Sequence, residues 1–162
     1  MSHRILIIDD EDDIREVAAL SLETVAGWDV AVASSGAQGL IRAAEYNPEA
    51  ILLDVMMPGM DGPSTFRELR KNPLTAGIPV LLLTAKVQSN DQRRFADLGV
   101  EAVLFKPFDP LTLATQIAGI LGWNYRLHGK RAKSLSRRSS GSHVEAVFAT
   151  DERALGCAGC RQ

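Results

Sequence analysis

The chain has 162 residues, of which 46% are hydrophobic and 23% charged, and its formal net charge is -2. This composition is ordinary for a soluble globular protein, and no apolar run approaches the roughly 20 residues that a membrane span needs. Both cysteines lie near the C-terminus, so no disulfide framework can cross the body of the protein. No signal peptide is visible before the first predicted strand, and we expect a cytoplasmic protein without a membrane span.

Five apolar segments predict buried strands, and each is followed by a helical pattern. Short, nearly continuous apolar runs are typical of parallel strands that are buried on both faces. Five alternations of strand and helix predict a parallel sheet covered by helices. The predicted strands are residues 4–9, 28–33, 50–54, 79–84 and 102–106.

The helical patterns carry recognisable start and stop signals. Ser35 with Gln38 predicts a capping box, Pro63 suits a first helical turn, and Asp109 is predicted to cap the last helix. The inner face of the first helix is predicted to include Val17, and that of the second to include Ile41. The fourth helix, near residues 87–98, is only weakly amphipathic, so we expect it to be the least firmly packed.

The charge is divided unevenly along the chain. Residues 1–121 contain 10 Lys and Arg against 17 Asp and Glu, whereas residues 122–162 contain 8 against 3. The second part also has few large apolar residues, so it cannot bury enough surface to offset the entropy of ordering. We therefore predict one folded domain over residues 3–121 and a basic, disordered tail over residues 122–162.

Polar side chains stand where four of the predicted strands end. In an open parallel sheet, chemistry takes place just beyond the carboxyl ends of the strands. A carboxylate there can act as a nucleophile and form an acyl phosphate, and hard oxygen ligands suit Mg²⁺. Phosphoryl transfer further needs cations and hydrogen-bond donors at the phosphoryl oxygens. The residues are Asp54 as nucleophile, Asp9, Asp10 and the Met56 carbonyl as metal ligands, and Lys106 and Thr84 as phosphoryl contacts.

These motifs together resemble a response-regulator receiver domain, the phospho-accepting module of two-component signalling. The matching features are Asp9-Asp10, Asp54 in the segment Leu53-Asp54-Val55-Met56-Met57-Pro58-Gly59-Met60-Asp61-Gly62, Thr84-Ala85, and Lys106-Pro107-Phe108. The resemblance covers about residues 3–121. It implies a flavodoxin-like, doubly wound (βα)5 sheet in the strand order 2-1-3-4-5 and a cis peptide bond before Pro107.

The resemblance also implies how such a domain works. A sensor histidine kinase or phosphotransfer protein would phosphorylate Asp54 with Mg²⁺, and the only catalysis would be that of the protein's own phosphorylation and dephosphorylation. A downstream protein partner would bind the face made by helix four, strand five and helix five.

One position departs from the pattern of many receivers. These have an aromatic residue three positions before the lysine, acting with the threonine as a rotameric switch, and here that position is Val103. Valine is short and stiff at χ1, so we expect residues 84–98 to carry more of the switch. Met56 and Lys86 occupy positions that tune the hydrolysis of the acyl phosphate in the family.

Two other functions remain open on the sequence. A Mg²⁺-dependent phosphohydrolase with an aspartyl-phosphate would carry an Asp-x-Asp pair, whereas this chain has Asp54-Val55-Met56. A binding scaffold that ignores phosphate would not need Asp54, Thr84 and Lys106 together. In the tail, Cys157 and Cys160 have the spacing of half a zinc site without a second pair. The basic run 126–138 lacks a recognition helix, so we expect no specific DNA binding.

Overall fold

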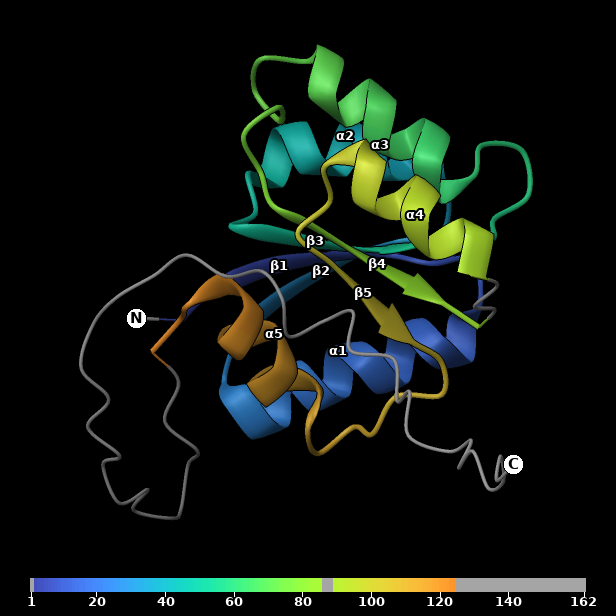
Figure 1. Ribbon diagram of the computed structural model, residues 1–162. Coiled ribbons are helices and arrows are strands. Elements are labelled where there is room, and N and C mark those ends of the chain that lie inside the picture. The colour runs from blue at the N-terminus through green and yellow to red at the C-terminus, as the bar shows by residue number, and fades with distance from the viewer. Residues whose placement is uncertain (1, 86–88, 125–162) are drawn as a thin grey trace, which may run out of the picture.

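A five-stranded parallel sheet forms the centre of the protein (Figure 1). The computed structural model describes residues 2–85 and 89–124. The strand order is β2-β1-β3-β4-β5, and every neighbouring pair is parallel. The predicted doubly wound, flavodoxin-like order is therefore confirmed. The strands are β1 (Arg4–Ile8), β2 (Asp29–Ala33), β3 (Ala50–Asp54), β4 (Val80–Thr84) and β5 (Ala102–Phe105).

The helices form a layer on each face of the sheet. In Figure 1, α1 (Asp12–Ala26) and α5 (Leu113–Leu121) lie below the sheet, and α2 (Gly36–Tyr46), α3 (Gly62–Lys71) and α4 (Ser89–Leu98) lie above it. Successive strand residues point to opposite faces, so each central strand must supply apolar side chains to two cores. Ile7 of β1, for example, packs in the core under α1 and α5, whereas Ile8 packs in the core on the other side. This double burial explains why the strand sequences are apolar without alternation.

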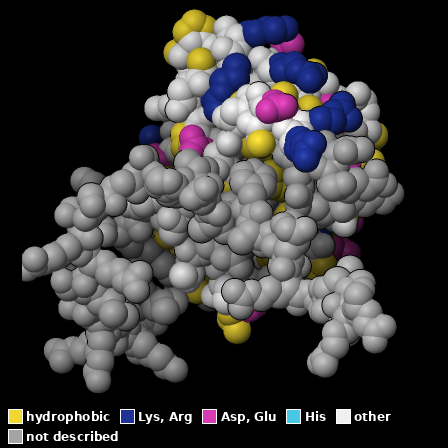
Figure 2. All heavy atoms as spheres, viewed as in Figure 1, with side chains coloured by type: hydrophobic (Ala, Val, Ile, Leu, Met, Phe, Trp, Pro, Cys, Tyr) yellow, Lys and Arg dark blue, Asp and Glu magenta, His cyan; other side chains and the backbone are white. Residues whose placement is uncertain are grey.

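Basic side chains gather on the layer above the sheet. Figure 2 shows several Lys and Arg side chains over the upper part of the molecule, with fewer acidic groups among them. Arg67, Arg70 and Lys71 belong to α3, and Arg93 and Arg94 belong to α4. The exposed surface of α3 and α4 therefore carries more basic than acidic side chains.

Most of the predicted helix signals are confirmed. The Gln38 backbone N–H donates to Ser35 Oγ over 3.2 Å, and Gln38 Oε1 accepts from the Ser34 backbone N–H over 2.7 Å. Gly27 and Gly122 end α1 and α5 with φ of 67°, a left-handed conformation that glycine adopts without strain. Trp123 then stacks on His3, with ring centroids 4.0 Å apart, and packs edge-on against Trp28. The packed structure therefore includes residue 123.

Three details of the predicted helices are wrong. Asp109 does not cap α5: its Oδ1 accepts from the Leu111 N–H over 2.9 Å, which makes a turn before the helix, and the helix begins four residues after Asp109, at Leu113. Val17 and Ile41 are 42% and 62% exposed rather than inward-facing. In α2 the inner face consists of small residues, because a Cβ on Gly39 would lie 2.4 Å from Ile8 Cδ1. The close approach of this helix to β1 turns Ile41 outward.

Some predictions concern residues outside the described ranges. These are the predicted first residues of the fourth helix, 87–88, the tuning residue Lys86, and the tail from residue 125 onward, including Cys157 and Cys160. Among the residues that are described, no helix has both the length and the hydropathy that would let it cross a membrane.

The start of α3 packs directly against the end of β3. The Gly62 N–H donates to the Val55 carbonyl over 3.0 Å, and Asp61 caps α3 by accepting from the Ser64 N–H over 2.8 Å. A Cβ on Gly62 would lie 2.4 Å from the backbone oxygen of Asp54 and 2.8 Å from Val55 Cα. Only glycine allows this approach, which fixes the loop that follows Asp54.

We predict that Gly62→Ala lowers the free energy of unfolding by about 1–3 kcal/mol, because the added methyl group would collide with backbone atoms that cannot rotate away. The matched control is Gly119→Ala in α5, where an added Cβ meets nothing within 4 Å. That change should raise the free energy of unfolding by about 0.5–1 kcal/mol, because alanine is the better helix former. Urea unfolding of both variants measures the difference, and equal effects would contradict the packing described for Gly62.

Candidate functional site

Polar side chains from three strands converge at one edge of the sheet. Asp9 follows β1, Asp54 ends β3, and Lys106 follows β5. Because β1 and β3 are adjacent and in register through Ile8 and Leu53, the two carboxylates are neighbours. Asp9 is fully buried and Asp54 is 3% exposed, so the pair lies at the bottom of a site whose floor is the apolar sheet.

Lys106 links these acids. Its Nζ lies 2.7 Å from Asp9 Oδ2, 3.0 Å from Glu11 Oε1 and 3.1 Å from Asp54 Oδ1, and its side chain is only 8% exposed. Burial alone would lower the pKa of this ammonium, but the hydrogen bonds with Asp9, Glu11 and Asp54 outweigh it and raise the pKa. Lys106 is therefore a fixed positive charge at the edge of the sheet. Its backbone N–H donates to the Thr84 carbonyl over 2.8 Å, and the Lys106–Pro107 peptide bond is cis, as the resemblance implied.

The folded protein disfavours the ionised form of Asp54, in contrast to that of Lys106. Burial and the nearby charge of Asp9 raise its pKa to about 6, although hydrogen bonds from Lys106 and from the Met56 backbone N–H act in the opposite direction. Desolvation and a like charge are the usual causes of such a shift. One ammonium thus does not compensate the buried carboxylates completely, and the site favours an additional cation.

The acidic cluster fits a hard divalent cation. Asp9, Asp10 and Asp54 each offer a carboxylate oxygen, and these oxygens all lie within 4.8 Å of one another. Asp10 Oδ1 and Asp54 Oδ2 are buried, and neither accepts a hydrogen bond from the part of the chain that the structure describes. Buried carboxylate oxygens without donors are costly unless a cation or proton binds them. An all-oxygen donor set of this size suits Mg²⁺.

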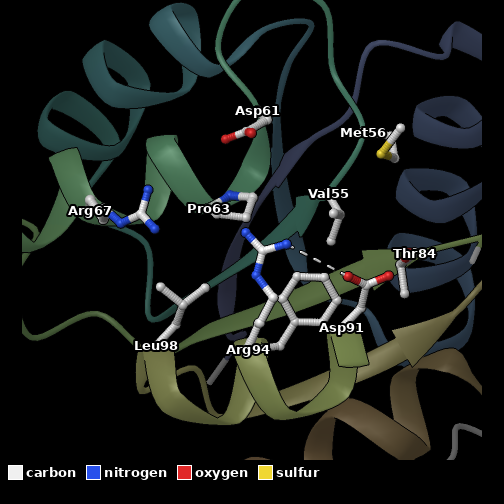
Figure 3. A pocket seen from close by; sticks show the side chains of 10 residues that line it. Val55, Met56, Asp61, Pro63, Arg67, Thr84, Asp91, Arg94 and Leu98 are labelled. Carbon is white, nitrogen blue, oxygen red and sulfur yellow. Dashed lines mark ion pairs between the residues drawn. The ribbon is translucent and has the colours of Figure 1, made fainter. Parts of the chain in front are cut away.

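A cavity of about 240 Å³ adjoins the site between the β3–α3 loop and α4. Thr84, 2% exposed at the end of β4, and Met56, 65% exposed after β3, lie on its wall. Figure 3 shows the Arg94 side chain reaching into this space from α4 beside Asp91, with Nη1 and Oδ1 3.9 Å apart. The cavity therefore separates α4 from the loop that follows Asp54.

Val103 stands on β5 at the position where many receivers have an aromatic residue. Val103 is 4% exposed and packs in the core with Phe95 of α4 and Phe66 of α3. Phe105 stands opposite Thr84 in the register of β4 and β5, and it is 43% exposed. The small buried residue and the large exposed one thus lie two positions apart on the same strand.

The structure brings together most of the residues that the sequence singled out. Asp9, Asp10, Asp54 and Lys106 meet in one cluster, and Thr84 and Met56 stand beside it on the cavity wall. Sequence reasoning assigned no individual role to Glu11, which contacts Lys106. Its place directly after the acidic pair was the available signal, but five consecutive acids gave no means of choosing among them.

A doubly wound parallel sheet with an acidic cluster and a lysine at its carboxyl edge is the arrangement expected of a phospho-accepting α/β domain. Residues 5–118 match the response regulator receiver domain. The chain belongs to this family, whose members act as phosphorylation switches in two-component signalling.

Individual relatives agree with this assignment. The DNA-binding dual master transcriptional regulator RpaA of Synechocystis is 40% identical over 118 residues, which are 73% of this chain and 48% of that protein. The chain spans about half the length of the curated relatives it matches.

Solved structures match over nearly their whole length. A putative response regulator from Chloroflexus aurantiacus is 34% identical with a TM-score of 0.69, covering 75% of this chain and 99% of that one. The chemotaxis protein CheY4 of Vibrio cholerae is 28% identical with a TM-score of 0.69, covering 74% and 99%. The described fold is thus that of a complete receiver domain.

We predict that Asp54→Asn stabilises the protein at pH 7 by about 3 kcal/mol in the absence of divalent cations, because a shift of one pKa unit corresponds to about 1.4 kcal/mol. The pKa of Asp54 is raised to about 6 in the folded protein and is about 3.9 when unfolded. The contribution of Asp54 to wild-type stability therefore falls as the pH rises from about 4 to about 6, where only the unfolded state has lost the proton.

Urea unfolding between pH 3.5 and 7.5 tests this. The gain from Asp54→Asn should be near zero below pH 4 and complete above pH 6. Saturating Mg²⁺ should reduce the stability difference between Asp54→Asn and the wild type at pH 7, because a cation that binds only the folded wild type stabilises the wild type. A gain that does not change with pH would contradict the raised pKa.

Proposed function

We propose that Asp54 accepts a phosphoryl group from a sensor histidine kinase or a phosphotransfer protein, and that the phosphorylated domain signals through a change in its surface. The observation that carries the proposal is the buried cluster of Asp9, Asp10 and Asp54 around the Lys106 ammonium, with carboxylate oxygens left without donors. A structural ion pair would satisfy those oxygens, whereas a site that binds a cation and a phosphoryl group leaves them open.

The transfer step needs few groups. One carboxylate oxygen of Asp54 attacks phosphorus in line with the donor's P–N bond, and that bond breaks as its electron pair returns to the donor imidazole nitrogen, which then takes a proton. Lys106 lies within 3.1 Å of the Asp54 carboxylate and stabilises the charge on the phosphoryl oxygens. Mg²⁺ held by Asp9, Asp10, Asp54 and the Met56 carbonyl would neutralise the remaining charge.

Hydrolysis of the acyl phosphate on Asp54 would end the signal. A water oxygen attacks phosphorus, the P–O bond to Asp54 breaks, and inorganic phosphate leaves while the electron pair returns to the carboxylate. Met56 and Lys86 flank this path in the family pattern. Met56 is 65% exposed beside the acceptor, so its side chain can restrict the approach of water. The protein's catalysis would be limited to these two reactions.

We further propose that the switch runs through Thr84 and α4. Thr84 moves toward the phosphoryl group, and α4 shifts into the cavity that separates it from the β3–α3 loop. Val103 is already buried and small, so no ring moves inward to replace the threonine. The output partner would bind the face of α4, β5 and α5, where Phe105 is 43% exposed.

The division into a receiver and a tail is part of the proposal, but the predicted boundary after residue 121 is moved beyond Trp123, which packs on His3 and Trp28. The expectation that the basic run 126–138 does not bind specific DNA also stays a prediction, because those residues lie outside the described ranges.

We predict that incubation with acetyl phosphate adds one phosphoryl group per chain, and only with Mg²⁺ present. Intact-mass measurement detects it. Asp54→Asn should remove the labelling, and Asp97→Asn, which changes an exposed carboxylate on α4, should leave it unchanged. Labelling that persists in Asp54→Asn at the native rate, or in the presence of a chelator, would show that the acceptor is misassigned.

We predict that a phosphoryl mimic changes the α4 region more than β5. Coupling between two sites in such switches is typically about 1–3 kcal/mol. Hydrogen exchange with Mg²⁺, with and without beryllofluoride, should change protection across residues 84–98 more than at residues 102–105. An equal or larger change on β5 with α4 unaffected would contradict the proposed route.

A further inference from the structure

We propose that Glu11 is a positioning residue that competes with the phosphoryl group for Lys106. In the unphosphorylated protein it holds the ammonium, and it is displaced when Asp54 carries a phosphoryl group. This inference rests on the proposed role of Asp54 and names a regulator of the same site.

The first step is the donor capacity of the lysine. An ammonium has three N–H donors and no more. Lys106 Nζ has three carboxylates within 3.1 Å, those of Asp9, Glu11 and Asp54. Phosphorylation esterifies Asp54, so its share of the ammonium passes to the phosphoryl group, and Asp9 and Glu11 are the two carboxylates that still contact Nζ. The contact with Glu11 is a well-aligned hydrogen bond of 3.0 Å, and it competes with the phosphoryl oxygens for the same donors.

The second step is the cost of losing each partner. Asp9 is fully buried, so without the ammonium its carboxylate would lack water and would depend on the bound cation alone for a counter-charge. The Glu11 side chain is 60% exposed and water can solvate it at once. Ion pairs with an exposed partner are weak for this reason. Glu11 is thus the partner that yields.

The third step is why Glu11 faces the lysine. It stands at the N-cap of α1, and its backbone N–H donates to Asp9 Oδ1 over 2.9 Å, which fixes the chain beside the acidic pair. Its side chain makes no capping hydrogen bond, so the carboxylate is available to Lys106. The next acid, Asp12, pairs with Arg15 instead. Among the described residues, the acidic segment therefore sends one exposed carboxylate to the ammonium.

The consequence is a built-in restraint on activation. Removing the Glu11 carboxylate from Lys106 should make every state with a phosphoryl-like group on Asp54 more favourable. The effect depends on reach as well as charge. A shortened acid at position 11 keeps the negative charge at the site but cannot extend to Nζ in the same way.

Full-chain wild type, Glu11→Gln, Glu11→Asp and Asp13→Asn are compared with saturating Mg²⁺. Calorimetric titration gives the affinity for beryllofluoride, and labelling at increasing acetyl phosphate concentration separates the maximal rate from the half-saturating concentration. Asp13 is an exposed acid of α1 that serves as the charge-matched control. Unfolding in urea confirms that each variant is folded.

Glu11→Gln and Glu11→Asp should both tighten beryllofluoride binding roughly tenfold and raise the maximal labelling rate, and Asp13→Asn should change either by less than about twofold. Equal tightening by Glu11→Gln and Asp13→Asn with none by Glu11→Asp would reduce the effect to overall charge and overturn the proposal. Equal affinity in all four proteins would overturn it as well. If none of them bound beryllofluoride, the proposed function itself would fail, which is a distinct result.

Discussion

The central physical constraint is a buried ammonium that is surrounded by more carboxylate charge than it can neutralise. Lys106 reaches Asp9 and Asp54 at the carboxyl edge of the sheet, where water is largely excluded. Low polarity strengthens both the attraction of the lysine and the repulsion between the acids. Burial and that repulsion raise the pKa of Asp54, and both would favour a further cation at the site. Under the proposed function, Mg²⁺ would offset this excess of carboxylate charge before Asp54 accepts a phosphoryl group.

The strand order and the two packed cores fix the positions of these charged side chains. The parallel order places β1 beside β3, so the two acids must be neighbours, and both cores are filled by side chains from the same central strands. The contact of Gly62 with the Asp54 backbone fixes the loop after the acceptor. By contrast, the side of Thr84 that faces α4 opens on a cavity. The rigid loop after Asp54 and the cavity beside Thr84 would together allow the proposed switch to move α4 without displacing the site residues.

The sequence predicted the sheet and most of the site for a clear reason. Continuous apolar runs ending in polar residues mark parallel strands, and a parallel sheet must collect those ends at one edge, so Asp9, Asp54 and Lys106 could be placed together before any coordinates. Helix faces were harder, because Gly39 allows a close approach to β1 that periodicity does not register, and Ile41 therefore turned outward. Asp109 was misplaced because a turn and a helix cap use the same residue types. The contact of Glu11 with Lys106 joins residues 95 positions apart, and no local pattern specifies it.

A crystal structure of the protein with Mg²⁺ and beryllofluoride tests the central claim most directly. The account predicts beryllium bonded to a carboxylate oxygen of Asp54, Mg²⁺ ligated by Asp9, Asp10 and Asp54, and Lys106 Nζ within hydrogen-bond distance of a fluoride. Beryllofluoride on another carboxylate, or Mg²⁺ bound away from these three acids, would contradict it.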